Sequence, residues 1–184
     1  MSTYQLGFIG TGNMGGALAQ AAAKSGADML LSNRTAAKAE ALATKLCCAA
    51  GTNLEIAESC SYIFLGVKPQ MLDGVVQSLS APIAASESVF VSMLAGVQLE
   101  RLERTLGADK KIIRILPNTP CAVGQGVVLN CANARVTDDD LAAFCALMAD
   151  AGIVDPVPEQ LIDAGCAITV SYTHLRAHET RGNL

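Results

Sequence analysis

Apolar positions along the chain follow two alternating periods. Short apolar runs of strand length are separated by longer segments whose apolar residues recur at helical spacing. This alternation is typical of βαβ units, in which helices connect parallel strands. We therefore expect an α/β fold, a Rossmann-type doubly wound, mostly parallel sheet with helices on both faces. The expected strands are residues 5–9, 29–32, 62–67, 88–93 and 112–116.

The helical segments between these strands have recognisable ends. Helices are expected over residues 14–25, 36–46, 69–79 and 99–106. Gly26 and Gly107 directly follow two of them, as glycine does after many helices. Thr52 and Glu55 have the spacing of a capping box, which predicts a further short helix.

The pattern changes after residue 116. A loop with two prolines and two glycines is followed by an apolar run at 127–131 and by a helix expected over 138–151. Three successive Asp residues at 138–140 suit the positive N-terminal end of that helix. Residues 153–157 fit a last strand, and Pro158 fits the first turn of another helix.

A Gly-x-Gly-x-x-Gly motif lies at the first strand-to-helix turn. Gly10 permits a tight turn, Gly12 lets the backbone approach a pyrophosphate, and Gly15 allows the helix to pack closely on the strand. The free N–H groups at the helix N-terminus favour an anion there. The motif therefore predicts a dinucleotide as the ligand.

The end of the second strand indicates which dinucleotide is bound. An NAD enzyme places Asp or Glu about 20 residues after the glycine motif, to hold the ribose hydroxyls. This chain has Ser32, Asn33 and Arg34 there instead. A guanidinium with neighbouring hydroxyl and amide donors suits a 2′-phosphate, so NADP is preferred over NAD. Alternatively, Arg34 is a solvated loop residue and Asn33 a turn former.

Two further positions follow strand ends, where open α/β sheets contact their ligands. Lys68, in the segment 66–69, is either a ligand contact or an exposed charge beside a helix-starting proline. Ala95 and Gly96 would let the backbone approach a nicotinamide or ribose, or they form a simple turn.

Composition excludes several classes of partner. The 184 residues favour one domain of ordinary size, and the net charge of −4 without a Lys/Arg cluster gives no nucleic-acid footprint. No apolar run is long enough to span a membrane. Seven cysteines without a Cys-x-x-Cys pair predict reduced, mostly buried thiols in a cytoplasmic protein. No metal site is expected, since His174 and His178 lack a third ligand.

Five motifs together resemble the pyrroline-5-carboxylate reductase family. They are Gly10-Thr11-Gly12-Asn13-Met14-Gly15, Ser32-Asn33-Arg34, Val67-Lys68-Pro69, Ser92-Met93-Leu94-Ala95-Gly96 and Pro117-Asn118-Thr119-Pro120. The last is the most discriminating, because related 3-hydroxyacid and 6-phosphogluconate dehydrogenases share the glycine loop but not this loop. The resemblance runs from about Tyr4 to about Thr169.

This resemblance implies NAD(P)H-dependent reduction of a small-molecule substrate, 1-pyrroline-5-carboxylate, to L-proline. It also implies that Asn118 faces the nicotinamide, while Asn53 either contacts the cofactor or only forms the helix-opening turn. The implied cofactor contacts are Ile9, Gly10, Thr11, Gly12, Asn13, Met14, Ser32, Arg34, Asn53, Gly66, Val67, Lys68, Pro69, Leu94, Ala95, Gly96 and Asn118.

The resemblance stops near residue 169. We expect an NADP-binding domain over residues 1–158, the first helix of a substrate and dimerisation domain over 159–169, and a tail unlike the family over 170–184. Most of the interface of the homo-oligomer that the family implies is then absent, and no catalytic residue is assigned. The alternatives are a non-catalytic NADP-binding module and a related 3-hydroxyacid or imine dehydrogenase.

Overall fold

The sheet of the computed structural model, which describes residues 3–165, has the strand order β3-β2-β1-β4-β5-β6-β7-β8. Its first six positions have the order of dinucleotide-binding folds, with all neighbours parallel. β7 then runs antiparallel to β6, and β8 runs parallel to β7. The predicted fold class is confirmed. The strands are β1 (Tyr4–Ile9), β2 (Met29–Ser32), β3 (Ala49–Ala50), β4 (Cys60–Leu65), β5 (Val89–Ser92), β6 (Lys111–Pro117), β7 (Gly126–Ala132) and β8 (Gly152–Pro156).

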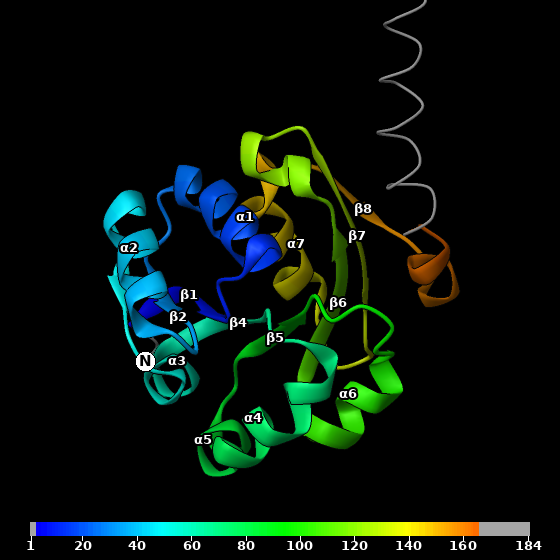
Figure 1. Ribbon diagram of the computed structural model, residues 1–184. Helices are drawn as coiled ribbons and strands as arrows, with labels where there is room; N and C mark the ends of the chain where they lie inside the picture. Colours follow the sequence, from blue (N-terminus) through cyan, green and yellow to red (C-terminus); the bar gives the residue numbers. More distant parts are fainter. Residues whose placement is uncertain (1–2, 166–184) are drawn as a thin grey trace, which may run out of the picture.

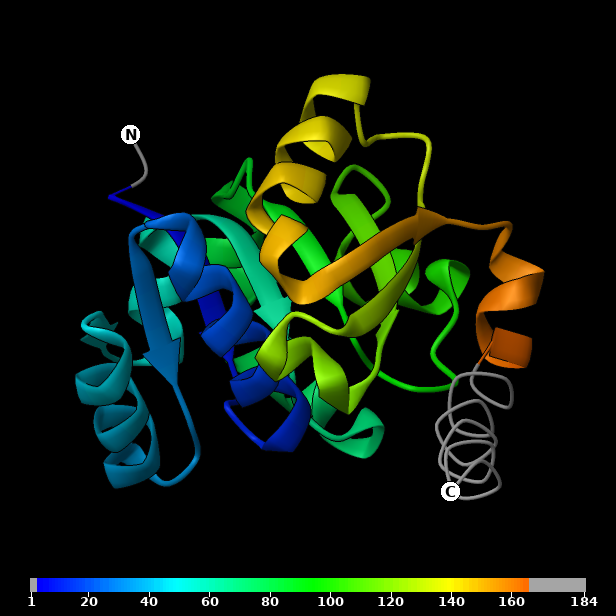
Figure 2. The same cartoon turned by 90° about the horizontal axis from the view of Figure 1, so that it is seen from above.

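Helices cover both faces of this sheet (Figures 1 and 2). The α-helices are α1 (Asn13–Ala22), α2 (Ala36–Leu46), α3 (Asn53–Ser59), α4 (Leu72–Ser78), α5 (Ser80–Ala85), α6 (Leu99–Leu106) and α7 (Asp138–Leu147). Short 3₁₀ turns are η1 (Ala23–Ser25), η2 (Pro69–Met71), η3 (Thr119–Val123) and η4 (Ala149–Ala151). Residues 159–165 are also helical, and we call them the helical segment 159–165. No helix within residues 3–165 has the length and apolar character to cross a membrane.

The core consists of two layers, one on each face of the sheet. On the first face, α1, α2 and α7 bury aromatic and aliphatic side chains, including a stacked pair, Phe8 and Phe64, whose ring centroids lie 4.5 Å apart. On the second face, α3 to α6 bury Ile56, Leu72 and Leu102 against the strands. Burial on both sides explains why the strands read as continuous apolar runs.

The structure shifts or divides several predicted elements. The strand predicted at 62–67 is β4, two residues earlier, because residues 66 and 67 leave the sheet to approach the glycine loop. The helix predicted at 69–79 is η2 followed by α4, and α5 follows directly. Pro82 has no N–H to bond back to Ser78, which breaks the helix there. The two-residue strand β3 was not predicted, since it is too short to show a period.

The expectation that the cysteines are mostly buried was wrong. Of the six described cysteines only Cys60 and Cys121 are buried, and Cys47 is exposed at the end of α2 with a left-handed φ of 54°. They are all free thiols. Burial raises the pKa of Cys60 to about 11, which keeps it protonated near neutral pH. Cys166, the two histidines and the tail lie outside the described residues.

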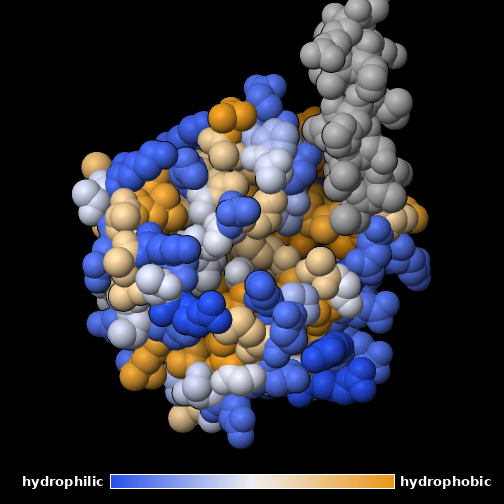
Figure 3. All heavy atoms as spheres, viewed as in Figure 1, coloured by the Kyte–Doolittle hydropathy of each residue, from blue (hydrophilic) through white to orange (hydrophobic). Residues whose placement is uncertain are grey.

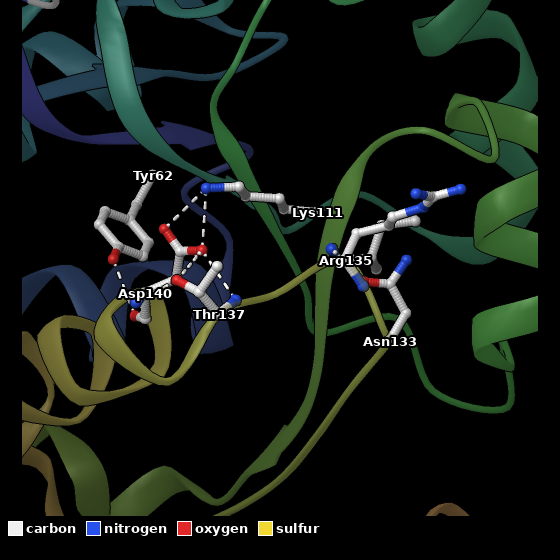
Figure 4. Close-up of polar contacts among 7 residues, drawn as sticks. Tyr62, Lys111, Asn133, Arg135, Thr137 and Asp140 are labelled. Atoms are coloured by element: carbon white, nitrogen blue, oxygen red, sulfur yellow. Dashed lines mark hydrogen bonds and ion pairs between the residues drawn. The ribbon is translucent and has the colours of Figure 1, made fainter.

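A polar cluster anchors the start of α7 to the amino ends of β4 and β6 (Figure 4). Thr137 and Asp140 form a capping box, in which the Asp140 carboxylate accepts the Thr137 N–H at 2.9 Å. Lys111 Nζ lies 2.9 Å from the same carboxylate, and the Tyr62 hydroxyl donates to the Asp140 carbonyl at 2.8 Å. Burial raises the pKa of Tyr62 to about 12, and the nearby negative charge of Asp140 adds to this rise.

This cluster predicts a pH-dependent stability. Burial alone would raise the pKa of Asp140, but hydrogen bonds from Lys111 and Thr137 outweigh it and lower the pKa. Asp140→Asn is expected to reduce the free energy of unfolding by about 1 kcal/mol at pH 7, as loss of a helix cap does. Because the pKa of Asp140 is lower in the folded state, its ionised carboxylate stabilises the folded protein fully at pH values above the unfolded pKa, about 3.9. This stabilisation is lost as the pH falls through the folded pKa.

Urea unfolding of both proteins between pH 3 and pH 7 measures the difference. Asp139→Asn is the matched control, because it removes an exposed carboxylate from the same helical turn. A difference that persists unchanged at pH 3 would contradict the role of the charged Asp140.

Candidate functional site

The carboxyl ends of β1, β2 and β4 open onto one cleft of about 810 Å³. It lies where the strand order reverses direction between β1 and β4, the place at which open α/β sheets bind ligands. The cleft is lined by Gly10, Thr11, Gly12, Asn13, Gly16, Ala17, Gln20, Asn33, Arg34, Thr35, Lys38, Leu42, Gly66, Val67, Lys68, Met71, Thr119 and Ala122.

The floor of the cleft is a contact between backbones. Gly10 has a φ of +99°, and a Cβ there would lie 2.6 Å from the carbonyl oxygen of Gly66. A Cβ at Gly15 or at Gly66 would collide with the carbonyl oxygen of Gly10. The loops after β1 and β4 and the start of α1 therefore pack together only because these three residues have no side chain.

Gly12 differs from the other two motif glycines, because the protein itself does not require a glycine there. Its φ is −69°, which any residue adopts, and a Cβ would meet nothing within 4 Å. It precedes α1, whose N-terminus has no side-chain cap and no acidic residue in its first turn. Open space in front of free N–H groups is the geometry that an anion needs.

The loop after β2 is tied to the glycine loop. Asn33 Nδ2 donates to Thr11 Oγ1 at 3.0 Å, and its Oδ1 accepts the Thr35 N–H at 3.3 Å. Asn33 is thus a turn former and also lines the cleft. Ser32 is buried, and its hydroxyl donates to Asn53 Oδ1. Ser32 and Asn53 therefore hold each other beneath the loop.

The charge of the cleft has one sign. Arg34, Lys38 and Lys68 line it with exposed side chains, and none of its lining residues is Asp or Glu. No ion pair or hydrogen bond of these three side chains occurs within residues 3–165. In a chain with a net charge of −4, this local excess of positive charge favours an anionic ligand.

The remaining predicted contacts are not among the residues that line this cleft. Ile9 and Leu94 are buried, Met14, Asn53 and Pro69 are half-buried, and Ala95 and Gly96 are exposed in the turn after β5. Asn118 Oδ1 accepts the Val127 N–H at 2.9 Å and faces the Cys121 thiol. That contact shapes η3, which brings Thr119 and Ala122 into the cleft. The role of these residues toward a cofactor stays a prediction.

Sequence reasoning missed several lining residues, of which Lys38 is the most informative. It lies in the first turn of α2, where the helix dipole disfavours a cation. A basic residue at that position was the available signal. Gln20 and Leu42 are half-buried residues of α1 and α2, and nothing in their spacing marks them as lining a cleft. The face of the molecule on which α1 begins mixes blue hydrophilic side chains with pale and tan ones (Figure 3).

Comparison with known proteins agrees with this geometry. Residues 5–96 match the family described as "NADP oxidoreductase coenzyme F420-dependent". The chain is 34% identical to a pyrroline-5-carboxylate reductase of Escherichia coli, covering 86% of this chain and 60% of that protein. It is 31% identical to pyrroline-5-carboxylate reductase 3 of Macaca fascicularis, covering 88% of this chain and 60% of the relative. The chain thus spans about 60% of the length of these relatives.

Solved structures have the same architecture. A pyrroline-5-carboxylate reductase from Coxiella burnetii superposes with a TM-score of 0.87 at 26% identity, over 100% of this chain and 73% of that one. A Plasmodium falciparum pyrroline carboxylate reductase with NADP bound gives a TM-score of 0.79 at 26% identity, over 99% and 71%. A reductive aminase from Aspergillus terreus, at 21% identity, shares the fold, with a TM-score of 0.75 over 96% and 64%.

The three motif glycines predict different outcomes of substitution. Gly15→Ala places a Cβ against the Gly10 carbonyl, which cannot rotate away, and is expected to cost about 3 kcal/mol of stability. Gly12→Ala meets open space and is expected to change stability by less than about 0.5 kcal/mol. Thermal unfolding by circular dichroism measures both, and equal losses for the two variants would contradict the backbone contact described above.

Proposed function

The chain belongs to the family of NADP oxidoreductases described as coenzyme F420-dependent, and from this membership and the cleft we propose that it binds NADPH for the reduction of an imine. It is a homologue of the N-terminal NAD(P)-binding domain of the pyrroline-5-carboxylate reductases. The domain boundary at residue 158, with the first helix of a substrate domain over 159–169, is part of this proposal.

The observation that carries the proposal is the positive, carboxylate-free cleft at the N-terminus of α1. The residues fit a dinucleotide phosphate in two ways. Gly12 leaves open the space that a side chain would fill, and the uncapped N–H groups of α1 point to an anion. The pyrophosphate would lie over residues 10–13, with Lys68 from the loop after β4 as a further cation.

The preference for NADPH over NADH follows from the end of β2. A ribose with a free 2′-hydroxyl is held by an acidic residue at this place, where this chain has none, and the hydroxyl of Ser32 already donates to Asn53. Arg34, in the loop before α2, and Lys38, in the first turn of α2, both line the cleft. Two cations without a carboxylate suit the 2′-phosphate of NADPH.

The substrate that we propose is 1-pyrroline-5-carboxylate, with L-proline as the product. NADPH, when bound, supplies a hydride to the carbon of the cyclic C=N bond, and the nitrogen takes a proton. The described residues hold and orient the dinucleotide. None of the residues that line the cleft is Asp, Glu, His, Cys or Tyr, and its two lysines are assigned to the phosphates, so we assign no general acid among them.

The cofactor assignment predicts selective losses of affinity. Arg34→Ala is expected to weaken NADPH binding by about 10- to 100-fold, the value of a charge-assisted hydrogen bond, and NADH binding by less than about twofold. Lys38→Ala is expected to act in the same direction with a smaller effect. Fluorescence titration with both nucleotides measures this. Arg104→Ala, an exposed arginine on α6, is the control, and equal losses for NADPH and NADH would exclude the 2′-phosphate contact.

The reaction is tested on the same protein. After saturation with NADPH, addition of 1-pyrroline-5-carboxylate is expected to oxidise the cofactor and release L-proline, measured by nicotinamide absorbance and amino-acid analysis. Binding without oxidation would support a non-catalytic NADP-binding module in place of the reductase. If NADPH is oxidised only by a 3-oxoacid, which is reduced to the 3-hydroxyacid, the substrate would be reassigned.

A further inference from the structure

Arg114 is a charged residue in the middle of the sheet. It lies on β6, between Ser92 of β5 and Cys131 of β7, and its side chain is only 2% exposed. A guanidinium in such a place is stable only when it is paired and hydrogen-bonded. Both of its ionic partners, Glu159 and Asp163, come from the helical segment 159–165, at 3.2 Å and 2.5 Å.

Glu159 makes a second contact that connects this charge to a distant loop. Its Oε1, which accepts from Arg114, also accepts the backbone N–H of Leu99 at 2.7 Å. Leu99 is the first residue of α6, and Gln98 before it gives this helix no side-chain cap. A carboxylate from a later segment thus caps the N-terminus of α6, where the helix dipole favours negative charge.

The turn before α6 is short and closed. It begins at the carboxyl end of β5 and is held by a hydrogen bond from the Val97 N–H to the Leu94 carbonyl at 3.3 Å. Leu94 and Val97 are buried, while Ala95 and Gly96 between them are exposed, with a φ of +71° at Gly96. This turn, residues 94–97, is separated from the capped Leu99 by one residue.

We propose that Glu159 is a positioning residue that fixes the turn 94–97 for the nicotinamide half of the dinucleotide, with Arg114 holding its carboxylate in place. The inference rests on the proposed function, because it requires that a dinucleotide lies along the carboxyl edge of the sheet. The adenosine end of the cleft, at Arg34 and Lys38, does not contact this cap. Docking of the helical segment 159–165 therefore controls one half of the cofactor site and leaves the other unchanged.

The test compares two ligands on the intact chain. NADPH carries a nicotinamide, and 2′-phospho-ADP-ribose is the same molecule without it. Glu159→Ala is expected to weaken NADPH binding about tenfold, the value of one charge-assisted hydrogen bond, and to leave binding of 2′-phospho-ADP-ribose within about twofold. Glu159→Gln keeps an oxygen that accepts the Leu99 N–H and is expected to restore most of the NADPH affinity.

Two further variants separate positioning from stability. Asp163→Asn removes the other carboxylate of Arg114 without touching Leu99, so it is expected to lower thermal stability and leave both affinities unchanged. Leu99→Pro removes the N–H together with the half-buried leucine side chain, and Leu99→Ala, which keeps the N–H, is its control. Proline is accepted at a first helical position, and Gln98 already has an extended backbone, so this variant is expected to fold with Glu159 and Arg114 still paired and to reproduce the loss of NADPH affinity.

The outcomes distinguish the inference from the function on which it rests. Wild-type protein that binds neither ligand would overturn the proposed cofactor. Wild-type protein that binds both, with Glu159→Ala and Leu99→Pro weakening both ligands equally or neither, would overturn the positioning role and leave the cofactor assignment intact. Selective loss of NADPH affinity in both variants would support it.

Discussion

The site depends on one contact, the approach of three backbone segments around the carbonyl oxygen of Gly10. The start of α1 reaches this oxygen at Gly15, and the loop after β4 reaches it at Gly66. A side chain at either position would push α1 or the β4 loop away from β1. Because both segments can approach the Gly10 carbonyl, the N-terminus of α1 lies at the place where the crossovers on its two sides leave the sheet in opposite directions. The cleft is a consequence of this arrangement.

The electrostatics of the cleft follow from what surrounds that helix terminus. A protein with more acidic than basic residues normally presents mixed charge at its surface, and several of its cations here pair with carboxylates. Within residues 3–165, Arg34, Lys38 and Lys68 pair with no carboxylate. Lys38 also sits in the first turn of α2, against the dipole of its own helix. A cation in that position is unfavourable for the free protein, and it becomes favourable only when an anion binds nearby.

The sequence predicted the elements whose burial is regular. Strands buried on both faces are apolar throughout, so β1, β2 and β5 were placed to within one or two residues, and the Thr52–Glu55 capping box begins α3 as expected. The misses have local causes. Pro82 divides a helix, β3 is too short for a period, and η3 is set by Asn118, whose side chain bonds a residue nine positions later. Lys38 joins the cleft through the tertiary position of α2, which local spacing does not reveal.

Arg114 shows how an unfavourable group can couple parts of a fold. Burying a guanidinium in a sheet costs free energy that an apolar side chain would not, so its pairing is weak evidence for stability as such. Its consequence is conditional. The sheet tolerates Arg114 only while Glu159 and Asp163 neutralise it. In return, Glu159 caps α6 only while Arg114 holds its carboxylate in place. An apolar residue at position 114 would pack the helical segment 159–165 without fixing the position of its carboxylates. The buried charge therefore specifies one register of that segment on the sheet, and the turn after β5 takes its position from that register.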